Sequence, residues 1–564
     1  MMKRIDVRGL GCFGSHAGHI GAAIRLWLSF LFALLLLGRT ANAQDHVWSQ
    51  LIGGAGNSTG VAVAADGSGN VVLGGEFDGA MTVGSGTVTT SQFSSDAYVV
   101  KFSASGAPLW IIQIGAAGDD TLQALAVDAA GNVAVAGSFA NGDVFLTFLD
   151  GQDGSVVWSH SFAGSDLTIA SGVAVDDSGH VILAAGFRGS ADFGGGALSS
   201  AGSYDLALAS YDSADGSHLW SRRFGGTGDE LADALAVGSN GVIAVAGNFS
   251  GTTDLGNGLH NTNGLSDIFI ATYSASNGTA IWSKALGGTG FDAAQAVSLD
   301  AQGNALVTGY FGLFGGPVNF GAGTVASAGG ADLFVAKYDA GGAHQWSRTF
   351  GGAGDDYGYG IAVDSSGNPT VTGTFQLTVD FGGGPHTSAG QIDSFVAHYT
   401  NAGQYDWSHS YGSIVTDKGF AVATDPSNQI LATGFTLWNV DFGGGLLTNA
   451  GNSDAYLVEL GSAQPAPTPT PTPSPTPQGT PSGNCPASPD LACVTGFQKG
   501  MLLVHGVPGK EKLVAKLLKG PALEQTDVGN PLDATRGGSG TAFSLCVYGE
   551  GPESRGRDQR RSPR

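Results

Sequence analysis

The chain has 564 residues, of which 94 are glycine and only 13% are charged. Such a composition is unusual for helical or α/β enzymes and indicates β structure with many tight turns. Residues 44–461 carry 8 Lys and Arg against 38 Asp and Glu, which argues against nucleic acid and anionic membrane surfaces as partners, because both need a basic face. The acidic surface is expected to serve solubility, with the steering of cationic ligands as the alternative.

Residues 1–43 have the pattern of a secretory signal peptide. Basic residues precede an apolar run from Leu26 to Leu37, and Ala41-Asn42-Ala43 then supplies the small residues that signal peptidase recognises. An uncleaved membrane anchor is the less favoured alternative, because a spanning helix needs about 20 apolar residues. We expect a mature chain that begins at Gln44, has no membrane span, and is secreted or held at the outer cell surface or in the periplasm.

The cysteines lie outside the main part of the chain. Residues 44–484 contain none, whereas Cys485, Cys493 and Cys546 lie near the C-terminus, where an exported protein can keep a disulfide. An odd number leaves one thiol free or without its partner, and the pairing stays open.

Tryptophan marks an internal repeat, which is the strongest signal in the sequence. Seven tryptophans recur 48 to 64 residues apart, a period too long for a coiled coil and too regular for chance. They are Trp48, Trp110, Trp158, Trp220, Trp282, Trp346 and Trp407. One large ring at the same point in each unit is best explained by packing between neighbouring units, in preference to seven ligand-stacking sites.

Each unit predicts four short antiparallel strands. Trp220–Phe224 exemplifies the strand that begins with Trp, and Ile361–Asp364 the Ala-Val-Asp strand that follows a Gly-rich turn. Val71–Phe77 exemplifies the third strand in the unit, and Asp332–Tyr338 the fourth. Alternating β-branched and aromatic residues between Gly, Asn, Asp and Ser turns are typical of such strands.

The two ends of the repeat region match each other. The region starts with a lone strand at Trp48 and stops after Asp454–Leu460, with no eighth Trp strand following. The first strand can therefore complete the last unit and close a ring. We predict an all-β fold over residues 44–461, a seven-bladed β-propeller closed by its N-terminal strand.

One unit lacks a segment that the others have. Between Phe139 and Val144 a few residues replace the usual Asp-Phe-Gly-Gly-Gly and Ser-Ala-Gly stretch. The four strands survive this deletion, so the stretch is predicted to be loop on one face of the disc.

Taken together, the motifs resemble a known family. Trp-Ser-x-x-Phe-Gly-Gly, Ala-Val-Asp-x-x-Gly-Asn, Val-x-Val-x-Gly-x-Phe, Asp-Phe-Gly-Gly-Gly and Asp-x-Phe-Val-Ala-Lys-Tyr, spread from Trp48 to Leu460, are similar to the bacterial β-propeller repeat of the SBBP type, common in secreted and surface proteins of myxobacteria and related bacteria. The resemblance implies a propeller fold and export. That family has no agreed activity and no catalytic residues to transfer.

A linker follows the repeats. Residues 462–484 are rich in alternating Pro and Thr, which predicts an extended polyproline II spacer and no packed domain.

Residues 485–564 form a predicted small C-terminal module. Met501–His505 and Ala542–Tyr548 have the pattern of strands, and Glu511–Leu518 fits a helix or a strand. The tail Glu553–Arg564 turns abruptly basic, which indicates either a truncated or frameshifted end or an ordinary disordered tail.

Two Gly-rich segments invite a calcium hypothesis. Gly226–Asp229 and Gly352–Asp356 resemble half of a calcium-binding nonapeptide, but copies about 60 residues apart cannot share an ion between stacked turns. Asp120, Asp229 and Asp355 are instead expected to accept hydrogen bonds from backbone N–H groups of turns. No cofactor is predicted, and calcium stays the alternative.

The enzymatic alternative rests on residues 149–158 and 211–220, which look like the tryptophan-docking repeat of quinoprotein dehydrogenases. Those enzymes resemble eight-bladed rings, whereas this chain has seven units. The polar residues that differ between units form no Ser/His/Asp or metal-binding spacing. They are Arg188, Arg222, Arg223, His260, Arg348, His386, His398 and His409.

We therefore assign no catalytic, cofactor-binding or metal-binding residue from the sequence. The expected function is a non-enzymatic binding scaffold for an unknown extracellular protein or polysaccharide, or a small solute at the central channel. The alternatives are a quinoprotein-like enzyme and a structural spacer of a surface assembly.

Overall fold

The computed structural model describes residues 45–91, 94–115, 117–461, 499–505 and 512–518. The chain divides into two compact units, Met1–Ala466 and Pro467–Arg564. The predicted signal peptide, the Pro/Thr linker, the C-terminal cysteines, the predicted strand at 542–548 and the basic tail lie outside the described residues. No helix in the described part of the chain is long and apolar enough to cross a membrane.

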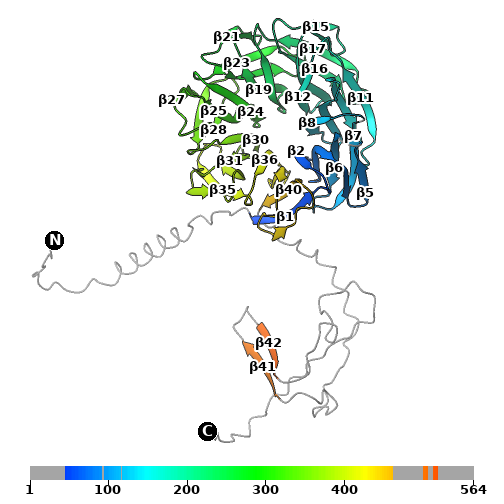
Figure 1. The fold of residues 1–564 in the computed structure, drawn as a ribbon, viewed down its shortest axis with the longest axis vertical. Coiled ribbons are helices and arrows are strands. Elements are labelled where there is room, and N and C mark those ends of the chain that lie inside the picture. Colours follow the sequence, from blue (N-terminus) through cyan, green and yellow to red (C-terminus); the bar gives the residue numbers. More distant parts are fainter. Residues whose placement is uncertain (1–44, 92–93, 116, 462–498, 506–511, 519–564) are drawn as a thin grey trace, which may run out of the picture. The chain divides into compact units, whose positions relative to one another are not determined.

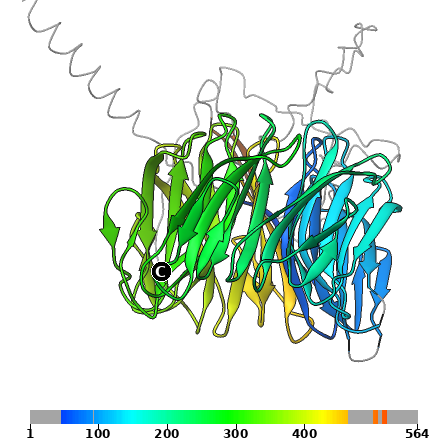
Figure 2. The same cartoon turned by 90° about the horizontal axis from the view of Figure 1, so that it is seen from above.

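The first unit is a ring of seven four-stranded antiparallel sheets, as predicted (Figure 1). Figure 2 shows these blades from the side, with their strands running between the two faces of the disc. The inner strands are β2 (Ser58–Ala65), β8 (Thr121–Val127), β12 (Thr168–Val175), β18 (Glu230–Val237), β24 (Phe291–Leu299), β30 (Tyr357–Val363) and β36 (Asp417–Thr424), which begin blades 1 to 7 in this order.

The other strands follow outward in each blade. The second strands are β3 (Val71–Asp78), β9 (Val133–Ser138), β13 (His180–Phe187), β19 (Val242–Phe249), β25 (Ala305–Leu313), β31 (Pro369–Phe375) and β37 (Ile430–Thr436). The third strands are β6 (Ser95–Phe102), β10 (Val144–Leu149), β16 (Asp205–Asp212), β22 (Asp267–Ser274), β28 (Asp332–Tyr338), β34 (Asp393–Tyr399) and β40 (Asp454–Gly461). The outer strands are β7 (Pro108–Ile114), β11 (Val156–Phe162), β17 (His218–Phe224), β23 (Ala280–Leu286), β29 (His344–Phe350), β35 (Tyr405–Tyr411) and β1 (Asp45–Ile52).

The ring closes through β1, which confirms the predicted closure. β1 pairs antiparallel with β40, from Asp45 opposite Gly461 to Ile52 opposite Ala455. The seventh blade therefore takes three strands from the end of the repeat region and its outer strand from the beginning (Figure 1). This pairing covers the edge that β40 would otherwise present to solvent.

Burial within a blade depends on the position of the strand. The third strand β28 is buried along its whole length, whereas the outer strand β29 has none of its residues fully buried. Third strands are covered on both faces by neighbouring blades. This explains why the Asp-x-Phe-Val-Ala-Lys-Tyr motif is almost continuously apolar.

The lysine of that motif is buried and paired. Lys101 Nζ lies 2.9 Å from Asp66 Oδ2, and Lys337 Nζ lies 2.7 Å from Asp300 Oδ2. In both blades the aspartate opens the turn after the inner strand. The aspartate that follows the inner strand therefore supplies the counter-ion for the lysine of the third strand in these two blades.

The Asp-Phe-Gly-Gly-Gly stretch is a two-stranded ribbon in most blades, so its prediction as loop was wrong. The ribbons are β4 (Ala80–Val83) with β5 (Gly86–Thr89), β14 (Ser190–Asp192) with β15 (Ala197–Ser199), β20 (Thr252–Asp254) with β21 (Leu259–Asn261), β26 (Val318–Asn319) with β27 (Thr324–Val325), β32 (Thr378–Asp380) with β33 (Pro385–Thr387), and β38 (Val440–Asp441) with β39 (Leu446–Leu447). Each joins the second strand of its blade to the third. In blade 2 only a turn over residues 139–143 makes this connection.

Local hydrogen bonds explain why so short a ribbon forms. Asp192 Oδ1 accepts the N–H groups of Gly194 (2.8 Å) and Gly196 (3.0 Å), both of which have positive φ. Phe193 is fully buried, and its carbonyl accepts the hydroxyl of Tyr211 at 2.7 Å. The aspartate thus fixes the turn and the phenylalanine anchors the ribbon to the core.

The tryptophans pack between blades, as predicted. Trp346 of blade 5 lies against Gly403 in the last turn of blade 6, and its Nε1 donates to the carbonyl of Asn401 at 2.9 Å. The same contact with a glycine of the next blade recurs for Trp48, Trp110, Trp158, Trp220 and Trp282.

The second unit contains one described hairpin. β41 (Lys499–His505) pairs antiparallel with β42 (Lys512–Leu518). The first strand was predicted, and the second resolves the choice between helix and strand in favour of strand.

Candidate functional site

Every inner strand has a β-bulge at the same place. In β18, Ala232 pairs with Gly247 and Ala234 with Ala246, which leaves Asp233 without a partner in the ladder. A bulge of this kind turns the side chain of the extra residue to a new direction. Around the ring the extra residues are Val61, Gln123, Ser171, Asp233, Gln295, Tyr359 and Phe420.

The inner strands lie around the centre of the ring (Figure 1). Their bulge residues lie around a cavity of about 190 Å³. All of them except Gln295 line it, and Ala296 lines it from the same strand. The residue two positions further along each strand is always a β-branched or leucine side chain, whereas the bulge residue differs from blade to blade. The residue type is therefore similar in every blade at the core position of the inner strand, whereas it differs between blades at the bulge position.

Asp233 is the only carboxylate that lines the cavity in the described part of the chain. Asp233 is solvent-exposed, yet the surrounding protein desolvates its carboxylate enough to raise the pKa to about 7. The charge of Asp233 also raises the pKa of Tyr310, after burial, which is the larger cause.

Aromatic side chains form one side of the channel. Ring centroids are 5.0 Å apart for Tyr310 and Tyr357, 5.8 Å for Tyr357 and Tyr359, and 5.6 Å for Tyr359 and Phe420. The contacts continue to Phe435 in β37 at 5.8 Å. Blades 5 to 7 thus supply a continuous aromatic cluster, of which Tyr359 and Phe420 line the cavity.

The aspartates considered for calcium accept backbone hydrogen bonds, as predicted. Asp120 Oδ1 accepts the N–H of Ala140 at 2.9 Å, and Asp355 Oδ1 accepts that of Ala331 at 3.0 Å. Asp229 Oδ1 accepts the N–H of Tyr204 at 3.3 Å. Among the described residues no group of three or more His, Cys, Asp or Glu side chains is arranged to hold a metal ion.

Pairs of buried carboxyl groups lie at the junctions between blades. A β-carbon on Gly225 would come 3.0 Å from Asp205 Oδ1 of blade 3 and 2.5 Å from Glu230 Oε2 of blade 4. Burial, with a smaller contribution from the charge of Asp205, raises the pKa of Glu230 to about 7. Burial likewise raises the pKa values of Asp356 and Asp393 to about 6.

The oxygens of these groups mainly hold turns in place. Asp356 accepts the N–H groups of Gly352 (2.8 Å) and Gln376 (3.0 Å), and Asp292 accepts those of Gly288 and Gly312, both at 2.7 Å. We interpret the pairs as structural for this reason.

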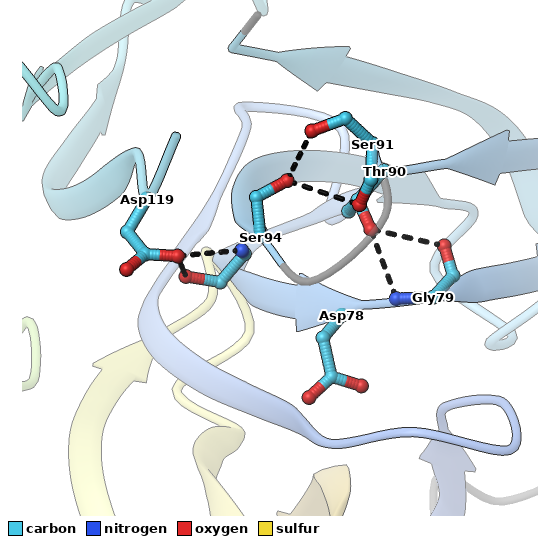
Figure 3. Close-up of a pocket in the computed structure, with 7 residues that line it drawn as sticks. Asp78, Gly79, Thr90, Ser91, Ser94 and Asp119 are labelled. Carbon is cyan, nitrogen blue, oxygen red and sulfur yellow. Dashed lines mark hydrogen bonds between the residues drawn. The ribbon is translucent and has the colours of Figure 1, made fainter. Parts of the chain in front are cut away.

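A second hollow, of about 680 Å³, lies beside the ribbon of blade 1 (Figure 3). Its polar groups are bonded to one another or to nearby residues: Thr90 accepts the N–H of Gly79, Asp119 accepts the N–H of Ser95, and Asp78 accepts the N–H of Asn57. A ligand there would have to compete with these bonds, so the channel is the stronger candidate.

The polar residues singled out in the sequence do not converge. Arg188 pairs with Asp166 at 2.7 Å, Arg223 with Asp205 at 2.8 Å, and His398 hydrogen-bonds Thr370 at 2.9 Å, in blades 3 and 6. Arg222 and Arg348 donate to carbonyls in the next blade, and His260 and His386 hydrogen-bond serines of outer strands. They stabilise single blades or the junctions between neighbouring blades and build no common site.

Sequence reasoning missed the channel residues. The signal was present, since one position in an otherwise apolar strand changes between Val, Gln, Ser, Asp, Tyr and Phe. The bulge that turns this position toward the axis leaves no mark in the residue pattern.

The chain matches a known protein-family model. The model of the beta-propeller repeat, SBBP, matches residues 345–373. This stretch runs from the outer strand of blade 5 into the second strand of blade 6.

Among curated proteins, the chain is 27% identical over 210 residues to an uncharacterized WD repeat-containing protein, L264, of Acanthamoeba polyphaga mimivirus. That match covers 31% of this chain and only 14% of the mimivirus protein.

Solved propellers resemble the fold at low identity. The Dos1 propeller is 11% identical, with 73% of this chain and 95% of that one covered at a TM-score of 0.39. BamB from Moraxella catarrhalis is 12% identical, with 73% and 99% covered at a TM-score of 0.32. A quinohemoprotein alcohol dehydrogenase from Comamonas testosteroni is 12% identical, with 75% and 78% covered at a TM-score of 0.36. Similarities this distant carry no argument about function.

Proposed function

We propose that this β-propeller repeat protein is an exported, non-enzymatic binding module whose ligand occupies the central channel. The supporting observation is where the blades differ. Their core positions repeat, but the bulge residues around the cavity are varied. A wall built from different side chains can present one asymmetric site, which a strictly repeated wall cannot.

The chemistry of the wall favours binding over catalysis. General acid and base catalysis uses groups with complementary roles, and the lining offers one carboxylate without a histidine, lysine or cysteine beside it. The lining is otherwise apolar or aromatic with a few hydroxyl and amide groups, as in many ligand pockets.

The size of the cavity limits the ligand. Its 190 Å³ is below the roughly 300–1,000 Å³ that drug-sized ligands occupy. The channel would therefore take a small solute, or a side group presented by the extracellular protein or polysaccharide that the sequence led us to expect.

Blocking the channel tests this function. The full chain and its Ser171→Trp variant would be screened against arrays of glycans, proteins and small solutes, with Ser239→Trp in an exposed turn as the matched control. We expect at least one ligand to bind the wild type and the control but not the blocked chain. Binding that is equal in all three folded chains, or absent from the wild type, would contradict the proposal.

Export is tested separately. Expression of the full chain should give a protein outside the cytoplasm whose N-terminus, read by mass spectrometry, is Gln44. An intact N-terminus in the cytoplasmic fraction would refute this part.

A further inference from the structure

The channel wall has a charged side and an aromatic side. Asp233 comes from blade 4, and Tyr359 and Phe420 come from blades 6 and 7. Val61, Gln123, Ser171 and the apolar residues that follow the bulges make up the remainder of the wall. A ligand in the cavity would meet one negative charge and at least two aromatic rings.

Asp233 has no hydrogen-bond or ion-pair partner in the described part of the chain, whereas several buried carboxylates of the ring pair with a cation. Asp66 and Asp300 pair with lysines, and Asp205 pairs with Arg223. Asp233 is exposed to the channel, so a ligand there can reach its carboxylate, and the raised pKa of this carboxylate reflects its partial desolvation. A positively charged ligand would supply the counter-ion that the protein itself does not provide for Asp233.

Building on the proposed function, we propose that the channel binds a small organic cation of the alkylammonium class, with its charge next to Asp233 and its alkyl groups against Tyr359 and Phe420. Aromatic rings attract cations through their electron-rich faces, most strongly where water is excluded. The alkyl groups would also bury apolar surface against the leucine and valine side chains of the wall.

Other ligand charges fit this wall less well. An anion would be repelled by Asp233 and by the negative charge of residues 44–461, which carry 38 acidic and 8 basic side chains. Calcium takes six to eight oxygen ligands, and the one carboxylate and three hydroxyl or amide side chains that line the cavity provide too few. The same acidic excess draws organic cations toward the disc.

Calorimetry with choline as the probe tests the proposal on the full chain. Wild type should bind choline saturably, and binding should be at least about tenfold weaker for Asp233→Asn and for Tyr359→Leu. Asp177→Asn removes an exposed carboxylate in the turn after β12, which does not line the cavity, and should leave the affinity unchanged. The neutral isostere 3,3-dimethylbutan-1-ol, which has the same shape without the charge, should bind at least about tenfold more weakly than choline.

The source of the cation is distinguished by a second probe, a short peptide with trimethyllysine. Binding of choline alone points to a free solute, and binding of the peptide points to a side chain of a protein partner. Absence of saturable binding by both probes, or equal binding of choline and its neutral isostere, would overturn the proposal. If Ser171→Trp abolishes binding of a neutral or anionic ligand found on the arrays, the binding function stands and the cation assignment alone fails.

Discussion

Glu459 lies directly opposite Trp48 across the two strands that close the ring. In blades 1 and 5 the same position, opposite Trp110 and Trp346, is a lysine paired with an aspartate. In blade 7 the aspartate is still present as Asp425, but the facing residue is a second acid. Burial raises the pKa of Glu459 to about 7, and the charge of Asp425 adds to this effect.

Glu459→Lys should therefore stabilise the propeller. It would replace a buried acid pair with the ion pair that blades 1 and 5 use, and we expect a gain of roughly 1–3 kcal/mol at pH 8. Chemical denaturation measures this change in the free energy of unfolding. Thr272→Lys is the matched control, because Thr272 occupies this position in blade 4, opposite Trp282, where Gly238 replaces the aspartate. Stabilisation by both changes, or by neither, would contradict the explanation.

Gly403→Ala should destabilise the junction between blades 5 and 6. Its φ is +70°, and an added β-carbon would lie 2.6 Å from the ring of Trp346. Left-handed backbone and overpacking together should cost at least about 2 kcal/mol. Thermal unfolding measures the loss, and Gly67→Ala, where the nearest atom would be 3.6 Å away, should change little. If Gly403→Ala leaves the thermal stability unchanged, the ring of Trp346 can move aside freely.

The propeller should be more stable at pH 5 than at pH 8. The folded pKa values of Glu230, Asp356, Asp393 and Glu459 are raised to between about 6 and about 7, whereas carboxyl groups of an unfolded chain titrate near pH 4. The folded state holds these protons more tightly, so its stability falls as the pH rises through the folded pKa values.

Melting temperature measured across this range tests the sign. Glu230→Gln should make the melting temperature depend less on pH and should raise it at pH 8, because the amide carries no charge to desolvate. The amide oxygen can still accept the N–H of Gly226, which Glu230 accepts at 3.0 Å. A melting temperature that rises between pH 5 and pH 8 would contradict the expected linkage.

Deletion of residues 45–52 should prevent a stable ring. It removes β1 and exposes the edge of β40, which is buried along its whole length. We expect rapid proteolysis and aggregation, measured by limited trypsin digestion and light scattering. Deletion of residues 467–564, which form the other compact unit, should leave the ring resistant to trypsin and to aggregation. Equal resistance of the two truncated chains would show that closure contributes little.

The sequence predicts the ring because its evidence is repeated. Seven copies of one tryptophan and a lone first strand determine the number of blades and the closing pair, since neither depends on any single residue. The ribbons escaped prediction because strands such as Ser190–Asp192 are only three residues long. Their stability comes from hydrogen bonds by one aspartate and from one buried phenylalanine.

The channel site escaped prediction for a different reason. Asp233, Tyr359 and Phe420 are separated by up to 187 positions along the chain, and only ring closure brings them around one axis. Their orientation depends on a bulge, which is a property of backbone pairing. Comparing the aligned repeats identifies the variable position, but not the cavity that it faces.

The bulges have a consequence for how such a protein can change. A residue outside the hydrogen-bond ladder can be exchanged without shifting strand register or disturbing the contacts between blades. Each of the seven axial positions can thus mutate independently of the other six, while the tryptophans and buried carboxylates preserve the architecture. The same ring could acquire new ligand preferences through single substitutions, in nature or in the laboratory, at little expense in folding.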